Sequence, residues 1–256
     1  MEKYGLIGYP LGHSFSRKFF TEKFANEGIN AEYLNFEIPD ATTLLDVVKG
    51  NPTLRGLNCT IPHKQAIIPM LDELSDEARR IGAVNVIRIS RQPEALTTPQ
   101  AKERGFHLKG YNSDIIGFTD SIRPLLKPYH TKALVLGTGG ASKAICVGLE
   151  KMGIEWKYVS RRPAPGQFTY DELTPAIIQE YPVIVNCSPV GMHPHVDECP
   201  ALPYESMTDR NLLFDLVYNP LETLFMRRGA EQGATVKNGL EMLHLQALAS
   251  WEFWNK

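Results

Sequence analysis

The chain has 256 residues, 43% of them hydrophobic and 22% charged, with a formal net charge of −2. This composition is typical of a globular protein large enough to bury a sizeable core, and the near-neutral charge without a dense basic tract gives no support for nucleic-acid or membrane binding. No run of about 18 consecutive apolar residues occurs, so no membrane span is expected, and the N-terminus lacks the apolar core of a signal peptide. The four scattered cysteines form no C-x-x-C pair, so a reduced, cytoplasmic protein is predicted.

The first hundred-odd residues are predicted to alternate strands with helices. Ser16 is expected to cap the first helix, which ends at Gly28, and residues 90–105 are interpreted as a polar surface excursion. The alternation favours an α/β fold with largely parallel strands. Strands are expected at 4–9, 32–38, 54–60, 83–89 and 107–112, and further helices at 42–49, 64–70 and 75–81.

The same alternation is predicted in the second half of the chain. Helices are expected at 115–126, 141–152, 170–180, 221–232 and 240–254, and strands at 133–136, 156–159, 183–187, 211–217 and 234–237. In the last helix, Gln246 lies about 140° around the axis from Glu241, so it is predicted to lie off the exposed face. The apolar face of that helix is predicted to comprise Leu240, Leu243, Ala247, Leu248, Trp251 and Trp254.

Residues 132–162 predict a strand, a glycine loop, a helix and a second strand, which is the form of a dinucleotide-binding βαβ unit. The N-terminus of its helix suits a pyrophosphate because its amide groups and dipole favour an anion. An NAD site wants an acidic residue after the second strand, whereas this chain has Ser160, Arg161 and Arg162. Arginine pairs bidentately with phosphate oxygens, so NADP is favoured over NAD. The alternative is an ordinary surface turn with two solvated arginines.

The strands before this unit are too many for the dinucleotide-binding domain alone. We therefore expect an N-terminal α/β domain at 1–113 and a Rossmann-type domain at 114–238, with the last helix, 239–256, packing back on the first domain. Such an arrangement predicts a cleft between the domains, where ligands usually bind.

Polar groups just beyond strand ends are the candidates for chemistry, because hydride transfer needs a proton donor or acceptor near the reacting carbon–oxygen bond. Thr60 and Lys64 lie in one predicted strand-to-helix turn, Asn85 in an apolar strand, and Asp114 just before a helix. Taken singly, each has an ordinary alternative: Lys64 as a solvated lysine, Asn85 as an edge-strand amide and Asp114 as a helix cap.

Two other groupings are weaker candidates. The segment from His193 to Cys199 contains potential metal ligands, but their close packing in a loop with proline does not match common zinc spacings. His13 beside Ser14 suggests a nucleophile pair, although no oxyanion-hole context accompanies it. Neither a metal nor a nucleophile pair is therefore predicted.

Taken together, these residues resemble the shikimate dehydrogenase family, the NADP-dependent enzymes of the aromatic amino-acid pathway, over almost the whole chain. The resemblance is carried by segments in the family's order. They are Gly8 to Ser16, the N-x-T-x-P-x-K turn from Asn58 to Lys64, Gly82 to Asn85, Asn112 to Asp114, Gly137 to Ser142, Ser160-Arg161, Asn186 to Met192, Val217 to Pro220 and Gly239 to Gln246. Ser160 and Ser113 stand where the family usually has asparagine and threonine.

The resemblance implies a reversible reduction of 3-dehydroshikimate to shikimate with NADPH. It implies Lys64 and Asp114 as the catalytic pair, with Ser14 and Ser16 on the substrate carboxylate. It further implies substrate contacts for Thr60, Asn85, Tyr218 and Gln246, and cofactor contacts for Asp76, Gly137, Thr138, Gly139, Gly140, Ala141, Ser160, Arg161, Leu216 and Gly239.

Three alternatives are considered. They are a paralogue that prefers quinate, a non-catalytic sensor that binds NADP or shikimate, and a folate-type dehydrogenase on a similar two-domain plan, which the loop with Ser14 and Ser16 disfavours. The partner expected is a small-molecule substrate, with neither nucleic acid nor membrane. The protein is expected to be a monomer or a homodimer.

Overall fold

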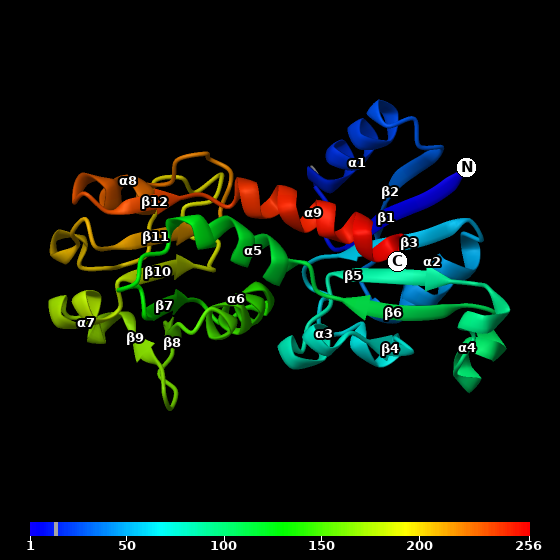
Figure 1. The fold of residues 1–256 in the computed structure, drawn as a ribbon, viewed down its shortest axis with the longest axis horizontal. Coiled ribbons are helices and arrows are strands. Elements are labelled where there is room, and N and C mark those ends of the chain that lie inside the picture. The colour runs from blue at the N-terminus through cyan, green and yellow to red at the C-terminus, as the bar shows by residue number, and fades with distance from the viewer. Residues whose placement is uncertain (13–14) are drawn as a thin grey trace. The chain divides into compact units, whose positions relative to one another are not determined.

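A computed structural model describes residues 1–12 and 15–256 and divides the chain into two compact units (Figure 1). The first unit comprises Met1–Ser113 together with Ala247–Lys256, and the second comprises Asp114–Gln246. The last helix therefore contributes its first residues to the second unit and its remaining residues to the first.

The first unit is built on a mixed sheet with strand order β2-β1-β3-β5-β6-β4, in which β5 runs antiparallel to both of its neighbours. Its strands are β1 (Glu2–Gly8), β2 (Ala31–Glu37), β3 (Leu54–Cys59), β4 (Glu73–Leu74), β5 (Val86–Ser90) and β6 (His107–Tyr111). Its helices are α1 (Phe15–Asn26), α2 (Leu44–Gly50), α3 (Asp76–Ile81) and α4 (Pro99–Arg104).

Side chains that alternate along these strands belong to two cores on opposite faces of the sheet. Ile7 and Ile87 pack with Leu44 and Val48 of α2 on one face. On the other face, Tyr4, Tyr33 and Val86 pack with Phe20 and Phe24 of α1 and with Trp254. Trp254 belongs to α9 (Leu240–Trp254), so the end of the last helix packs on the first unit as expected. The predicted boundary differs, because residues 239–246, expected to join the first domain, belong to the second unit.

Gly56 allows the last helix to approach the sheet closely. A Cβ atom at this position would lie 2.3 Å from the Trp254 ring, and the ring nitrogen donates a hydrogen bond to the carbonyl of Ile87 at 3.1 Å. Glycine is therefore required in the middle of β3, where it otherwise weakens a strand.

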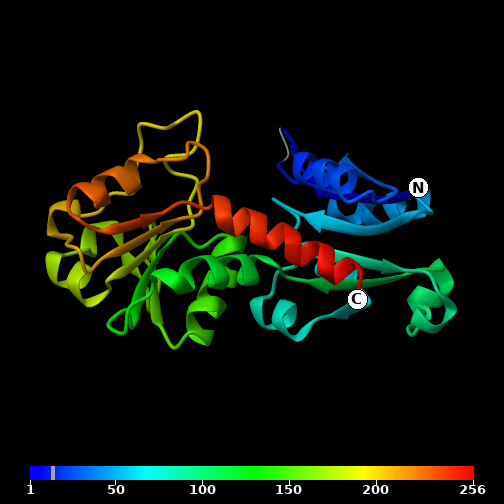
Figure 2. The ribbon, with the colours of Figure 1, turned by 45° about the horizontal axis from the view of Figure 1, so that its top comes forward.

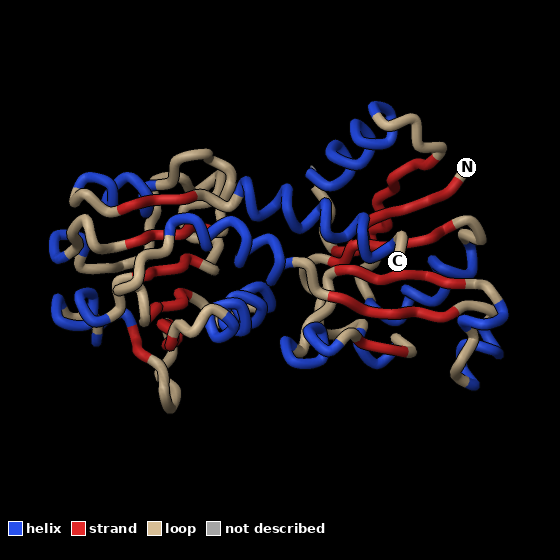
Figure 3. The backbone as a smooth tube through the Cα atoms, in the orientation of Figure 1, coloured by secondary structure: helices blue, strands red, loops and turns tan. Residues whose placement is uncertain are grey.

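The second unit is a doubly covered parallel sheet with order β12-β11-β10-β7-β8-β9 (Figure 3). Its strands are β7 (Lys132–Leu136), β8 (Glu155–Ser160), β9 (Phe168–Thr169), β10 (Val183–Asn186), β11 (Leu212–Asp215) and β12 (Thr235–Lys237). Its helices are α5 (Asp114–Ile122), α6 (Gly140–Lys151), α7 (Pro175–Glu180) and α8 (Leu224–Glu231).

Alternation again separates two cores in this sheet. Val135 faces α5 and α6, where it packs with Phe118 and Ile145, whereas Leu134 faces α7 and α8, where it packs with Ile178 and Phe225. Burial on both faces explains the continuous apolar run Ala133–Leu136, which is typical of parallel sheets. Figure 2 shows the same elements from a second direction.

Several predicted elements are wrong in detail. The helix expected at 64–70 is a series of turns ending in a 3-10 turn, Ile68–Met70, where Pro69 cannot donate to the preceding turn. The helix expected at 170–180 is a 3-10 turn followed by α7, which starts at Pro175. The excursion at 90–105 contains α4.

Three residues also lie in different places from those expected. Asn85 precedes β5 rather than lying within it, and α1 begins at Phe15, so Ser16 is inside the helix rather than its cap. Leu248 is 43% exposed, whereas Met242 and Ala249 are buried, because α9 has apolar contacts on more than one side. Among the described residues, none of the helices has the length and hydropathy needed to cross a bilayer.

Candidate active site

The turn after β3 places Thr60 and Lys64 at the carboxyl-terminal edge of the first sheet. The Thr60 amide donates to the carbonyl of Ile7 at 3.0 Å, and the Lys64 carbonyl accepts from the amide of Val84 at 2.7 Å. A Cβ atom on Gly8 would lie 2.5 Å from the Thr60 methyl group, so glycine there makes room for this turn. Both Thr60 and Lys64 are partly exposed, and their backbone is fixed by neighbouring strand ends.

A buried chain of hydrogen bonds holds Asn85. Its side-chain oxygen accepts from the Ser113 amide at 2.7 Å, and its amide nitrogen lies 3.1 Å from the Ser113 hydroxyl. The Asn58 amide donates to the Ser250 hydroxyl at 2.9 Å, and Ser250 lies 3.2 Å from the Ser113 hydroxyl. All four side chains are at most 5% exposed. Ser113 therefore holds the Asn85 side-chain amide in one orientation by contacting both its oxygen and its nitrogen.

The same chain of bonds reaches Ser16 through Tyr33. The Tyr33 hydroxyl donates to the side-chain oxygen of Asn58 at 2.8 Å. Burial raises the pKa of Tyr33 well above its usual range, and a hydrogen bond from Ser16 opposes part of that rise. Ser16 is thus connected to Asn85 through buried polar groups. Ser14 and His13, also singled out in the sequence, lie outside the described residues.

In the second unit, Asp114 and Gln246 belong to two helices in close contact. Asp114 is the first residue of α5 and is 7% exposed, and Gln246 in α9 is 9% exposed. A Cβ atom on Gly117, one turn after Asp114, would lie 3.1 Å from the Cβ of Gln246 and 2.5 Å from the carbonyl of Met242. The prediction that Gln246 lies off the exposed face is confirmed.

The glycine loop has the geometry expected of a nucleotide-binding turn. Gly137 has a φ of +96°, a conformation that favours glycine, and its amide donates to the carbonyl of Val159 at 2.9 Å. Thr138 and Gly139 are exposed, and Gly140 begins α6. The Ser142 hydroxyl donates to the carbonyl of Gly139 at 2.7 Å, which closes the turn from inside. The helix N-terminus, with Gly140 and Ala141 in its first turn, therefore offers backbone amides to an anion.

Arg161 and Arg162 extend from the end of β8 into solvent. The Ser160 hydroxyl accepts from the Arg162 amide at 3.3 Å, and the Arg162 carbonyl accepts from Gln167 at 2.7 Å. Burial raises the pKa of Tyr170, and the nearby charge of Arg161 opposes the rise. The arginine side chains, together with the glycine loop of the neighbouring strand β7, fit a nucleotide carrying an extra phosphate.

Leu216 and Gly239 pack closely at the same edge of the second sheet. The Gly239 amide donates to the carbonyl of Val217 at 3.1 Å, and a Cβ on Gly239 would lie 2.2 Å from the Leu216 carbonyl. Tyr218, two residues after Leu216, is 37% exposed. Asp76 belongs to the other unit, where it is the exposed first residue of α3.

Sequence reasoning missed a buried carboxylate, Asp215, at the end of β11. It accepts hydrogen bonds from Thr223 at 2.6 Å and from Asn186 and the Val217 amide at 3.0 Å. Burial raises the pKa of Asp215 to about 6, and these three bonds limit the rise. Asn186 also accepts from the Ser188 hydroxyl at 2.7 Å. The sequence signal that could have revealed Asp215 is a polar residue at the end of each of two apolar strands, Asn186 in β10 and Asp215 in β11.

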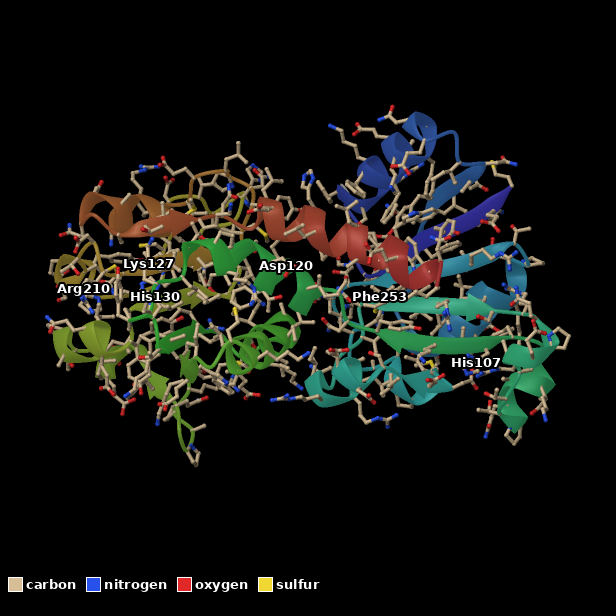
Figure 4. All side chains as sticks on the ribbon, in the orientation of Figure 1. His107, Asp120, Lys127, His130, Arg210 and Phe253 are labelled. Carbon is tan, nitrogen blue, oxygen red and sulfur yellow. The ribbon has the colours of Figure 1, made fainter. Side chains whose placement is uncertain are left out.

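A separate titratable cluster lies at the opposite, amino-terminal edge of the second sheet (Figure 4). The His130 ring accepts from the Lys127 amide at 3.1 Å, and its other nitrogen lies 3.0 Å from the Arg210 carbonyl. Burial lowers the pKa of His130. Because both ring nitrogens are engaged with backbone, we interpret His130 as a structural histidine. Nowhere in 1–12 or 15–256 do three or more His, Cys, Asp or Glu side chains form a group suited to a metal ion.

Comparison with known proteins matches residues 6–87 to the family model described as the shikimate dehydrogenase substrate binding domain. The curated shikimate dehydrogenase (NADP(+)) of Caldanaerobacter subterraneus subsp. tengcongensis is 35% identical over 270 residues, which cover 98% of this chain and 90% of the relative.

Solved structures give the same result. The shikimate dehydrogenase of Aquifex aeolicus superposes with a TM-score of 0.83 at 31% identity and covers 99% of this chain and 92% of its own. The shikimate 5-dehydrogenase of Thermus thermophilus, solved in complex with NADP(H) and shikimate, has a TM-score of 0.79 at 29% identity, with coverage of 99% and 93%.

Proposed function

The chain belongs to the shikimate dehydrogenase family, and on that premise we propose that it catalyses the reversible reduction of 3-dehydroshikimate to shikimate with NADPH. The observation that carries this proposal is the match to curated NADP-dependent relatives over 98% of the chain. The first unit would act as the substrate domain and the second as the cofactor domain, and we expect a cytoplasmic monomer or homodimer.

NADPH would bind at the carboxyl-terminal edge of the second sheet. The pyrophosphate would bind to backbone amides of the glycine loop, because amides at the start of α6 favour an anion. The residues of this loop are Gly137, Thr138, Gly139, Gly140 and Ala141. The 2′-phosphate would lie against Arg161 and Ser160, both at the end of β8. Residues proposed near the nicotinamide are Asp76, Leu216 and Gly239. When bound, the cofactor supplies the hydride.

The substrate would be held by side chains at the strand ends. Ser14 and Ser16 are proposed to bind the carboxylate by hydroxyl donation. The ring hydroxyls would contact Thr60, Asn85, Tyr218 and Gln246. Asn85 suits this role because its amide is already held in place by Ser113, so little ordering entropy is lost on binding.

Lys64 and Asp114 are proposed as the catalytic pair. As hydride reaches the C3 carbonyl carbon, negative charge develops on the oxygen, and the Lys64 ammonium would stabilise that charge and then donate its proton. Asp114 would orient the ammonium and accept a hydrogen bond from a substrate hydroxyl. In the reverse direction, neutral Lys64 would take the hydroxyl proton as hydride leaves the ring carbon.

The test is the absorbance of reduced nicotinamide during oxidation of shikimate or quinate, each with NADP+ or NAD+. We expect kcat/KM for shikimate to exceed that for quinate by at least about tenfold, which corresponds to about 1.4 kcal/mol in transition-state binding. Equal or reversed values would favour the quinate paralogue. Binding of NADP+ and shikimate without turnover of either acid would favour the sensor.

A further inference from the structure

The last helix contributes a buried hydroxyl, Ser250, to the region where substrate is proposed to bind. Ser250 is 0% exposed and lies between Asn58 at 2.9 Å and Ser113 at 3.2 Å. Its neighbours Ala249 and Trp254 are apolar and buried. A hydroxyl in such surroundings is costly unless it is hydrogen-bonded, so its partners determine its conformation.

The hydrogen bonds that link Asn58, Ser250, Ser113 and Asn85 can run in one direction. Asn58 has its oxygen occupied by the Tyr33 hydroxyl, so its amide nitrogen must donate, and it donates to Ser250. Ser250 can then donate to the Ser113 hydroxyl, which lies 3.2 Å away. Ser113 in turn lies 3.3 Å from the Asn85 side-chain oxygen, to which it can donate.

The ends of this series are two residues proposed to bind substrate. One end is Asn85, and the other is Ser16, which hydrogen-bonds to Tyr33. A second path supports the same residue, since the backbone carbonyl of Asn85 accepts from the Cys59 amide at 2.8 Å and from Asn58 at 3.3 Å. Ser250 is the member of the series contributed by the last helix.

We propose that Ser250 is a positioning residue for substrate binding, which orients the Asn85 side-chain amide through Ser113 and supports the Asn85 backbone through Asn58. This inference rests on the proposed function, because it assigns Asn85 to shikimate. A residue with this role changes how well the substrate is held and leaves the proton-transfer group untouched. A hydroxyl that only stabilises the helix would leave both substrate binding and proton transfer unchanged.

The experiment compares Ser250→Ala with Ser121→Ala in steady-state kinetics and thermal unfolding. Ser121 is a matched control because it is also a buried helical serine, and its hydroxyl donates at 3.1 Å to the carbonyl of Phe118 in its own helix. For Ser250→Ala we expect the KM for shikimate to rise about threefold to tenfold, with kcat and the KM for NADP+ within about twofold of wild type. Ser121→Ala should leave all three unchanged.

Two further variants keep the test decisive. Ser250→Thr retains the hydroxyl and should restore the KM, and Ser250→Cys retains the size but bonds weakly, so it should resemble alanine. A folded Ser250→Ala or Ser250→Cys enzyme with an unchanged KM for shikimate would overturn the inference alone. A wild-type protein that does not oxidise shikimate would overturn the proposed function and, with it, the premise of this inference.

Discussion

The two sheets present different chemistry at their carboxyl-terminal edges. In the first unit, the edge carries Lys64 and a set of neutral amides and hydroxyls that bond to one another, as Asn58, Asn85 and Ser250 do. In the second unit, the edge combines a buried carboxylate, Asp215, with a glycine loop and exposed arginines. The edge of the first sheet holds side chains in fixed orientations, whereas the edge of the second sheet offers backbone amides and charged groups. Variants in the two units should therefore change different measured quantities.

The largest expected effect is on Lys64, because the first unit should supply the proton chemistry. Lys64→Ala should lose on the order of 10²–10⁴ in kcat, with the KM for shikimate changed by less than about tenfold. Lys64→Met, which keeps the bulk of the stem, should behave alike. Steady-state kinetics with circular dichroism is the measurement, and Lys49→Ala, at an exposed helical lysine, is the control. A folded Lys64→Ala enzyme with nearly normal kcat would refute the assignment.

The buried charge of the second unit should appear in the pH dependence of stability. The pKa of Asp215 is about 6 in the folded protein, against 3.8 for an unperturbed aspartate, so the folded protein binds this proton more tightly than the unfolded chain does. Its contribution to stability is therefore fully present below pH 3.8 and is lost as pH rises through about 6. The difference is about 3 kcal/mol at about 1.4 kcal/mol per pKa unit.

Asp215→Asn isolates that contribution because asparagine does not titrate. The free energy of unfolding of wild type minus that of Asp215→Asn, measured by urea at several pH values, should decrease between about pH 4 and 6. A constant difference across this range would show that Asp215 titrates normally.

Cofactor discrimination should depend on the second unit alone. Arg161→Ala should weaken NADP binding roughly tenfold to a hundredfold and barely affect NAD, because a hydrogen bond to a charged group contributes about 1.5–3 kcal/mol. Dissociation constants for both cofactors provide the measurement, and Arg162→Ala is the comparison. If both cofactors weaken alike, Arg161 is structural and Arg162 becomes the better candidate.

The smallest of these effects concerns the packing of the last helix on the first sheet. Gly56→Ala should reduce the free energy of unfolding by about 1–3 kcal/mol, because its methyl group would overlap the Trp254 ring. Gly50→Ala is the control, since no neighbouring atom lies within 4 Å of its added Cβ, and helical alanine should be neutral or stabilising. Equal effects of the two changes, measured by urea unfolding, would show that the sheet and helix adjust freely.

The sequence predicted the order of the longer strands and helices, because most apolar runs lie between polar or glycine-containing turns, but it did not predict the short strands β4 and β9 or the helix α4. It did not reveal that β5 runs antiparallel, since apolar periodicity carries no direction. Nor did it predict the turns after Lys64, where Pro69 breaks an otherwise helical pattern. Local sequence patterns therefore predict where helices and strands occur, whereas contacts between distant segments decide the direction of each strand and where each element ends.

The candidate site was predicted unevenly for a similar reason. The glycine loop and Arg161 are visible because loop glycines and a charge after a strand are local signals. Ser250 and Tyr33 carry no such signal, since a serine in a helix and a tyrosine in a strand are ordinary residues. Their role depends on contacts with Asn58 across long stretches of chain, and only the fold brings those contacts together.

The division of α9 between the two units affects the order in which the protein can fold during synthesis. The second unit is one continuous stretch, Asp114–Gln246, whereas the first unit also needs Ala247–Lys256 to complete the aromatic core around Tyr4. Those residues leave the ribosome after the whole of the second unit. Domains usually fold in N-terminal to C-terminal order as they emerge. In this chain the first unit cannot complete its aromatic core until Ala247–Lys256 follow the whole of the second unit, so it cannot finish folding first.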